Sequence, residues 1–275
     1  MTAASLLTIN LSHGQTSFVT SPDSIQIDYE VHGTGEPALI FVHGWSCDRT
    51  YWKGQLETFS KNFKVVAIDL AGHGESGLGR RAWTIEAFGA DVVAVVEKLH
   101  LKRVILIGHS MGGDVIAEAA RQLRGRVAGL VMVDTYKKLG AGRSPEAVHT
   151  FVENLRANFV DSARSFVRSM FVPNSDSSLE NWIVKDMSSA SPSVAIGSVE
   201  SAMSYSRRMP QTLEELKLPV IAINPDNAPT DVASLEHYGV KLMIMPGVGH
   251  FLMMEDPTRF NELLNQAIDK LVQEK

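Results

Sequence analysis

The stretch that decides the fold is Val104–Gly113, with the sequence VILIGHSMGG. Its first four residues are apolar and rich in β-branched side chains, which is typical of a strand buried on both faces. Ser110 follows in a G-x-S-x-G pattern between Gly108 and Gly112, directly before a helical stretch. The glycines leave room for a sharp turn that holds the serine hydroxyl at a helix N-terminus. Ser110 is therefore the candidate nucleophile.

Short apolar runs alternate with helical stretches on both sides of this motif. Residues 84–99 carry apolar side chains at helical spacing behind Thr84, a good N-cap, and residues 256–272 predict a closing helix. Residues 24–32 alternate apolar and polar side chains, as a half-exposed strand does. This order predicts an α/β fold with a doubly wound, mostly parallel sheet. The runs expected to form its other buried strands are Ala38–Val42, Val65–Ile68, Leu130–Val133, Leu218–Ile223 and Val240–Met245.

The alternation stops after Asp134. Residues 136–210 show helical periodicity with several phenylalanines and methionines and no strand-like run. We therefore expect a helical cap over 136–210 and a core formed by 1–135 and 211–275. The cap should lie over the carboxyl ends of the strands, where open α/β sheets bind ligands.

Composition narrows the class of protein. The 275 residues are 44% apolar and carry a formal net charge of −5 without long runs of one sign, which gives no reason to expect a nucleic acid or membrane partner. The single cysteine, Cys47, cannot form an intramolecular disulfide. Residues 1–15 lack the features of a signal peptide, and no apolar run reaches the roughly 18 residues of a membrane span. A soluble, cytoplasmic protein is expected.

Four motifs together resemble the α/β-hydrolase superfamily, in its expected order and over nearly the whole chain. The resemblance implies a cofactor-free hydrolase with a helical cap. It says little about the substrate, because that superfamily includes esterases, lactonases, C–C bond hydrolases, perhydrolases and a few cofactor-free oxygenases. No His, Asp or Cys cluster has the spacing of a metal site. The motifs are Phe41–Trp45 (FVHGW), Asp69–Ser76 (DLAGHGES), Gly108–Gly113 (GHSMGG) and Gly247–Phe251 (GVGHF).

A serine needs an imidazole that takes its proton, and donors that stabilise the oxyanion. His250 follows the last strand in a glycine-rich turn, at the position of the general base in the family. The N–H of Met111, directly after the nucleophile, should be one oxyanion donor. By resemblance, the second is the N–H of Trp45. His43 is expected to fix the oxyanion loop by hydrogen bonding.

The acid of the triad stays open. The family usually places it after the seventh strand within G-x-x-D, but here Asn224 replaces the glycine and Asn227 occupies the acid position. Asp226 lies one residue early and is narrowly preferred. Asp134, at the end of the sixth strand, is the alternative, because a minority of the family uses an acid there. Asp231 is a third option.

Together these residues predict a carboxylic ester hydrolase of the carboxylesterase type that acts on a small-molecule ester. Lactone or C–C bond hydrolysis on the same groups is an alternative. A cofactor-free oxygenase would differ in using a His–Asp pair without the serine. A hydrolase-fold ligand-binding protein with negligible turnover is the alternative outside enzymology.

Overall fold

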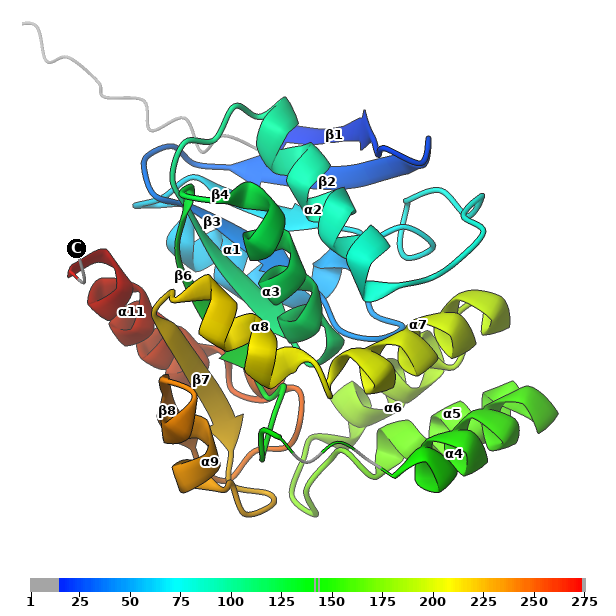
Figure 1. Cartoon of the computed structure of the whole chain (residues 1–275). Helices are drawn as coiled ribbons and strands as arrows, with labels where there is room; N and C mark the ends of the chain where they lie inside the picture. Colours follow the sequence, from blue (N-terminus) through cyan, green and yellow to red (C-terminus); the bar gives the residue numbers. More distant parts are fainter. Residues whose placement is uncertain (1–14, 141, 143, 274–275) are drawn as a thin grey trace, which may run out of the picture.

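A computed structural model describes residues 15–140, 142 and 144–273 of the chain. Residues 1–14, on which the expectation about a signal peptide mainly rests, lie outside this part. One sheet runs through the molecule in the order β1-β2-β4-β3-β5-β6-β7-β8. β1 and β2 are antiparallel to their neighbours, and the strands from β4 to β8 pair in parallel (Figure 1). The strands are β1 Gln15–Thr20, β2 Gln26–His32, β3 Ala38–Val42, β4 Val65–Ile68, β5 Val104–His109, β6 Val127–Val133, β7 Val220–Pro225 and β8 Val240–Met245.

Helices cover both faces of this sheet, which confirms the predicted doubly wound α/β class. α2, α3 and α8 pack on one face, and α1 and α11 pack on the other (Figure 1). Thr84 caps α2 as expected, because its side chain accepts a hydrogen bond from the N–H of Ala87. The helices of these layers are η1 Arg49–Trp52, α1 Lys53–Phe59, α2 Ile85–Lys98, α3 Met111–Leu123, α8 Met209–Leu216, α9 Val232–His237, α10 Leu252–Glu255 and α11 Pro257–Gln273.

Four further helices lie between β6 and β7. They are α4 Pro145–Ala157, α5 Phe159–Arg168, α6 Ser177–Met187 and α7 Pro192–Tyr205. They form a separate group below and to the right of the sheet in Figure 1, and α7 contacts α2 and α3. This group falls within the segment expected to form the cap, and we refer to α4–α7 as the cap.

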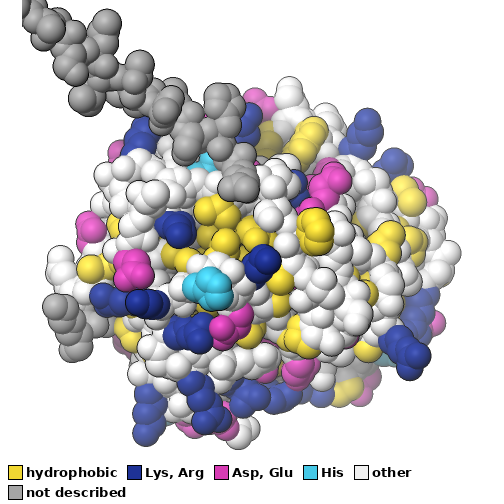
Figure 2. Space-filling view, turned by 90° about the horizontal axis from the view of Figure 1, so that it is seen from above, with side chains coloured by type: hydrophobic (Ala, Val, Ile, Leu, Met, Phe, Trp, Pro, Cys, Tyr) yellow, Lys and Arg dark blue, Asp and Glu magenta, His cyan; other side chains and the backbone are white. Residues whose placement is uncertain are grey.

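The core follows the central strands. β3, β4 and β5 are buried along their whole length, as their continuous apolar sequences predict. Figure 2 shows a small apolar patch near the middle of one face, with basic, acidic and histidine side chains around it. Within the described residues, no helix is both long and apolar enough to cross a bilayer.

Candidate active site

The turn between β5 and α3 forces Ser110 into a strained backbone conformation. Its φ is 52° and its ψ is −119°, a region that side-chain-bearing residues rarely adopt. A Cβ on Gly108 would lie 2.2 Å from the carbonyl oxygen of Gly112, and one on Gly112 would lie 2.5 Å from that of Val42. Both contacts are with backbone, which cannot move aside. The glycines of the motif are therefore required for this turn.

His250 lies in the loop after β8, and its ring is held by a carboxylate. Nδ1 of His250 lies 2.7 Å from Oδ2 of Asp134, close enough for the Nδ1–H to donate a strong hydrogen bond. This bond fixes the tautomer and leaves Nε2 as the nitrogen that can accept a proton. Ser110 and His250 line the same cavity.

Asp134 owes its position to the end of β6. Its backbone is left-handed, with φ 42°, and its N–H donates to the carbonyl of Ile223. Lys137 Nζ lies 3.2 Å from Oδ1 of Asp134 and donates to the carbonyl of Pro225 at 2.6 Å, so it ties the carboxylate to β7. Burial alone would raise the pKa of Asp134, but the hydrogen bond with His250 and the charge of Lys137 outweigh it and hold this pKa below its ordinary value. The group therefore stays ionised at neutral pH.

The other two candidate acids lie away from His250. Asp226 is exposed, and its carboxylate accepts a hydrogen bond from the N–H of Gly247 at 2.8 Å. Asp231 caps α9 and pairs with Lys138. The narrow preference for Asp226 is therefore replaced by Asp134, since only the β6 carboxylate contacts the imidazole among these three.

Trp45 and Met111 both line the cavity, as oxyanion donors must. Met111 is the first residue of α3, so its N–H has no acceptor within the helix. Among the described residues, the N–H of Trp45 also has no acceptor. His43 supports this loop as expected: its Nδ1–H donates to the carbonyl of Gly44 at 2.8 Å, and its Nε2 accepts from the N–H of Leu70 at 3.0 Å.

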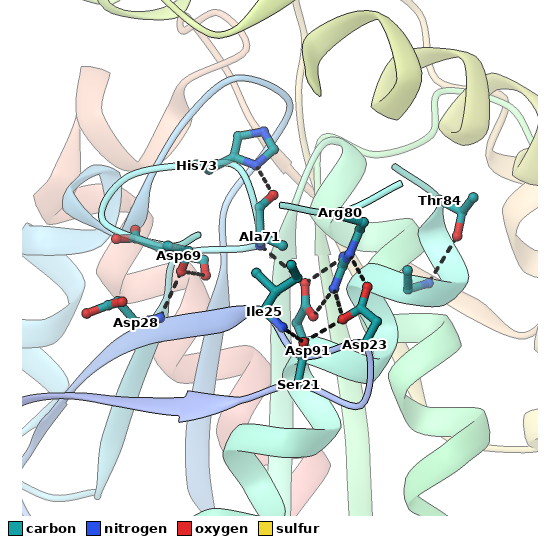
Figure 3. Close-up of polar contacts among 12 residues, drawn as sticks. Ser21, Asp23, Ile25, Asp28, Asp69, Ala71, His73, Arg80, Thr84 and Asp91 are labelled. Atoms are coloured by element: carbon teal, nitrogen blue, oxygen red, sulfur yellow. Dashed lines mark hydrogen bonds and ion pairs between the residues drawn. The ribbon is translucent and has the colours of Figure 1, made fainter. Parts of the chain in front are cut away.

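The loop after β4, which carries Leu70, is anchored by a buried charge cluster. Asp91 on α2 accepts a hydrogen bond from the N–H of Ala71 and two from the guanidinium of Arg80 (Figure 3). The same guanidinium reaches Asp23 before β2. His43 is therefore held by a loop that is itself tied to two other elements.

His109, the variable residue of the turn, is a contact that sequence reasoning missed. It is buried, and its Nε2 lies 2.9 Å from the carbonyl oxygen of His250. Burial and the nearby His250 lower the pKa of His109 to about 3, so the ring is neutral. Its proton must be on Nε2, because a carbonyl can only accept. His109 therefore holds the backbone of the His250 loop.

Glu255 fixes the same loop from the other side. Its carboxylate accepts hydrogen bonds from the N–H groups of Gly249 and Phe251 and from the hydroxyl of Ser175 in the segment between α5 and α6. The N–H of His250 donates to the carbonyl of Met170, at the start of that segment. The histidine loop is thus bonded directly to the cap.

The cavity at Ser110 has a volume of about 280 Å³, close to the lower end of small-molecule sites. Residues of both the core and the cap line it. No group of three or more His, Cys, Asp or Glu side chains within the described part of the chain could hold a metal ion. The cap residues that line it are Phe166, Met170, Met187, Val199, Ala202 and Met203.

Residues 39–263 match the model of the α/β hydrolase family, and the chain belongs to this family. An esterase from Thermogutta terrifontis is 26% identical, with a TM-score of 0.80 over 94% of this chain and 99% of that one. An esterase from Exiguobacterium antarcticum, at 18% identity, shares the fold, with a TM-score of 0.79 over 93% of this chain and 100% of that one. A non-heme haloperoxidase of Rhodococcus erythropolis is 37% identical over 118 residues, which cover 42% of this chain and 43% of that relative. The chain thus spans under half the length of this curated relative.

Replacing Asp134 by Asn should damage turnover far more than replacing Asp226 by Asn. An amide in place of the Asp134 carboxylate cannot stabilise an imidazolium and allows the wrong tautomer, a defect that costs about 10⁴-fold in kcat in a serine protease. Asp226→Asn alters an exposed side chain and should leave kcat nearly unchanged. Both variants should be compared by kcat on one ester substrate, and a larger loss for Asp226→Asn would contradict the assignment.

Replacing His109 by Phe should lower kcat by about tenfold with little change in KM, because the loop that carries His250 loses one neutral hydrogen bond. His109→Gln, whose side-chain amide can donate, should recover part of this loss. Thermal unfolding of both variants serves as the control. Equal kcat in the wild type and His109→Phe, with only a lower Tm, would show that the contact merely stabilises the fold.

Proposed function

We propose that this chain is a serine hydrolase that cleaves a carboxylic ester through an acyl-enzyme on Ser110. The observation that carries the proposal is the hydrogen bond between Asp134 and His250 at the cavity that Ser110 lines. Acyl transfer requires a positioned serine, an imidazole oriented by a carboxylate, and two available backbone N–H groups. The similarity to an esterase over nearly the full length of both chains supports the same reaction.

In this mechanism Nε2 of His250 takes the proton as Ser110 Oγ attacks the carbonyl carbon. The carbonyl π bond opens, and the resulting oxyanion accepts hydrogen bonds from the N–H groups of Trp45 and Met111. Asp134 stabilises the imidazolium that forms. Collapse of this intermediate expels the alcohol, which takes the proton from His250. Water then attacks the acyl-enzyme by the same route and regenerates the serine. A lactone would follow the same path and give a hydroxy acid.

The similarity to a haloperoxidase favours a second candidate reaction. If hydrogen peroxide replaces water in the second half-reaction, the acyl-enzyme yields a peracid, which oxidises halide to hypohalite in solution and returns the carboxylic acid. Adding peroxide and bromide to an ester assay, with a brominatable dye as the indicator, tests this. Dye bromination that requires both the ester and Ser110 would support perhydrolysis, and its absence while ester hydrolysis proceeds would count against it.

Ser110→Ala should abolish ester turnover and leave the fold intact. The variant keeps a small side chain at the strained turn and loses only the nucleophile, so kcat should fall by at least about a thousandfold. A fluorophosphonate should label wild-type Ser110 and should leave the variant unlabelled. Near-normal turnover in Ser110→Ala would overturn the serine mechanism and favour chemistry by His250 and Asp134 alone. If the fluorophosphonate leaves Ser110 unmodified and the wild type turns over no ester, a binding protein is favoured.

A further inference from the structure

The cavity at Ser110 contains a buried carboxylate that the mechanism does not use. Asp114 is on α3, four residues beyond Ser110, and its side chain lines the cavity while the residue is only 5% exposed. Four residues are about one turn of an α-helix, or ~6 Å along its axis. Asp114 therefore lies on the same side of α3 as the nucleophile, at a distance that a short substrate chain can span.

The protein satisfies only one oxygen of this carboxylate. The hydroxyl of Tyr136 donates to Oδ1 of Asp114, and among the described residues no donor reaches Oδ2. Glu118, one turn further along α3, is equally buried but accepts hydrogen bonds from Arg121, Gln122 and Tyr205. The two acids differ in that Glu118 does not line the cavity, whereas Asp114 does.

Several charged or polar side chains of the cavity have partners in the protein, whereas Thr135 Oγ1 and His109 Nδ1 are buried without a partner among the described residues. His250 pairs with Asp134, and Lys138 pairs with Asp231. The indole N–H of Trp45 donates to the carbonyl of Ala195. A buried carboxylate with one unsatisfied oxygen is costly, because ionised groups need donors when water is excluded. A bound molecule that fills the cavity would have to supply this donor or leave the group unpaired.

The position of this acid is fixed from two sides. Asp114 is in the first turn of α3, where the helix dipole favours a negative charge. Tyr136 is held by the side chain of Asn224 on β7, whose Nδ2–H donates to the Tyr136 carbonyl at 2.9 Å. Burial raises the pKa of Asp114 to about 7, and the hydrogen bond from Tyr136 limits the rise. Both protonation states are therefore populated near neutral pH, and a donor would select the ionised one.

We propose that Asp114 is a specificity-determining residue that accepts a hydrogen bond from a donor on the substrate: a hydroxyl, an amide N–H or an ammonium group. This inference rests on the proposed ester hydrolysis at Ser110. The surrounding Met, Val and Phe side chains of the cap accept apolar surface, and the carboxylate recognises one polar group within it. The preferred substrate is an ester with a mostly apolar body and a donor that reaches Asp114, about one helical turn from Ser110, while the scissile carbonyl lies at the serine.

Matched 4-nitrophenyl esters test the amide case, assayed at a pH above the pKa of Asp114. The 3-acetamidopropanoate ester carries an N–H, its N-methyl derivative lacks that donor, and the hexanoate ester has an apolar chain of the same length. Wild-type kcat/KM should be at least about tenfold higher for the N–H ester than for the N-methyl ester, since the free energy of one hydrogen bond to a charged group corresponds to about this factor. Esters of 3-hydroxypropanoate and 3-aminopropanoate, each compared with butanoate, distinguish hydroxyl and ammonium donors from the amide.

Two variants of Asp114 and one control complete the experiment. Asp114→Leu should bring the ratio of kcat/KM for the N–H ester to that for the N-methyl ester close to one. Asp114→Asn keeps a side chain of the same shape and should reduce this ratio, so it serves as the test if the leucine variant folds poorly. Glu118→Gln is the matched control, because it neutralises a buried acid of the same helix outside the cavity, and its ratio should equal that of the wild type.

Two results would overturn the inference, and they are distinguishable. In the first, wild-type protein hydrolyses hexanoate and Ser110 is labelled by a fluorophosphonate, but no donor-bearing ester is preferred, or the preference survives in both Asp114 variants. The proposed function then stands, and Asp114 has no role in substrate selection. If no ester turns over and Ser110 is unreactive, the proposed function fails and this inference fails with it.

Discussion

The close approach of α3 to the ends of β3 and β5 is the constraint on which the site depends. At Gly112 the backbone of the helix lies so near the carbonyl of Val42 that no side chain fits between them. This approach forces the strained conformation of Ser110, and it also brings the first N–H of α3 beside the loop after β3. Backbone packing thus places Ser110, the proposed nucleophile, and the two expected oxyanion donors. Side chains elsewhere then act on a geometry that the sheet and helix have already set, which is the preorganisation that acyl transfer requires.

The histidine is placed differently, by hydrogen bonds from separate parts of the chain. His109 holds the carbonyl of His250 from the β5 turn, Glu255 holds the neighbouring N–H groups, and the carbonyl of Met170 in the cap accepts the N–H of His250 itself. A Cβ on Gly249 would lie 2.6 Å from that same Met170 carbonyl, so the loop and the cap segment fit closely. Movement of this cap segment would disturb the loop that carries His250, the proposed general base. The cap therefore lines the cavity and also helps to orient the loop of His250.

Sequence patterns predicted the sheet, the turn at Ser110 and the loop of His250, because each depends on local requirements: continuous apolar runs, glycines where a side chain would clash, and a position after the last strand. The contacts of the acid could not be predicted in this way. Both the loop after β6 and the loop after β7 contain a carboxylate. Whether Asp134 or Asp226 reaches the imidazole depends on the direction in which each loop leaves its strand. The left-handed φ of Asp134 and the hydrogen bond from Lys137 to Pro225 favour Asp134 as the acid that contacts His250, and neither produces a periodic pattern in the sequence. His109 and Glu255 were missed for the same reason, although a buried histidine beside the nucleophile was a cue that the motif itself contained.

The loop after β6 carries several residues of the candidate site. Asp134 contacts the imidazole, Lys137 pairs with that carboxylate, and Tyr136 donates a hydrogen bond to Asp114, which lines the cavity. Asn224, which stands where the family usually has glycine, supports this loop by binding the carbonyl of Tyr136. The departure from the family pattern on β7 and the contact of the β6 acid with His250 are therefore connected: Asn224 on β7 supplies a supporting hydrogen bond, and Asp134 contacts the imidazole. Because one short loop joins Asp134 to Tyr136, the partner of Asp114, the proposed substrate recognition at Asp114 and the orientation of His250 depend on the same few residues of backbone.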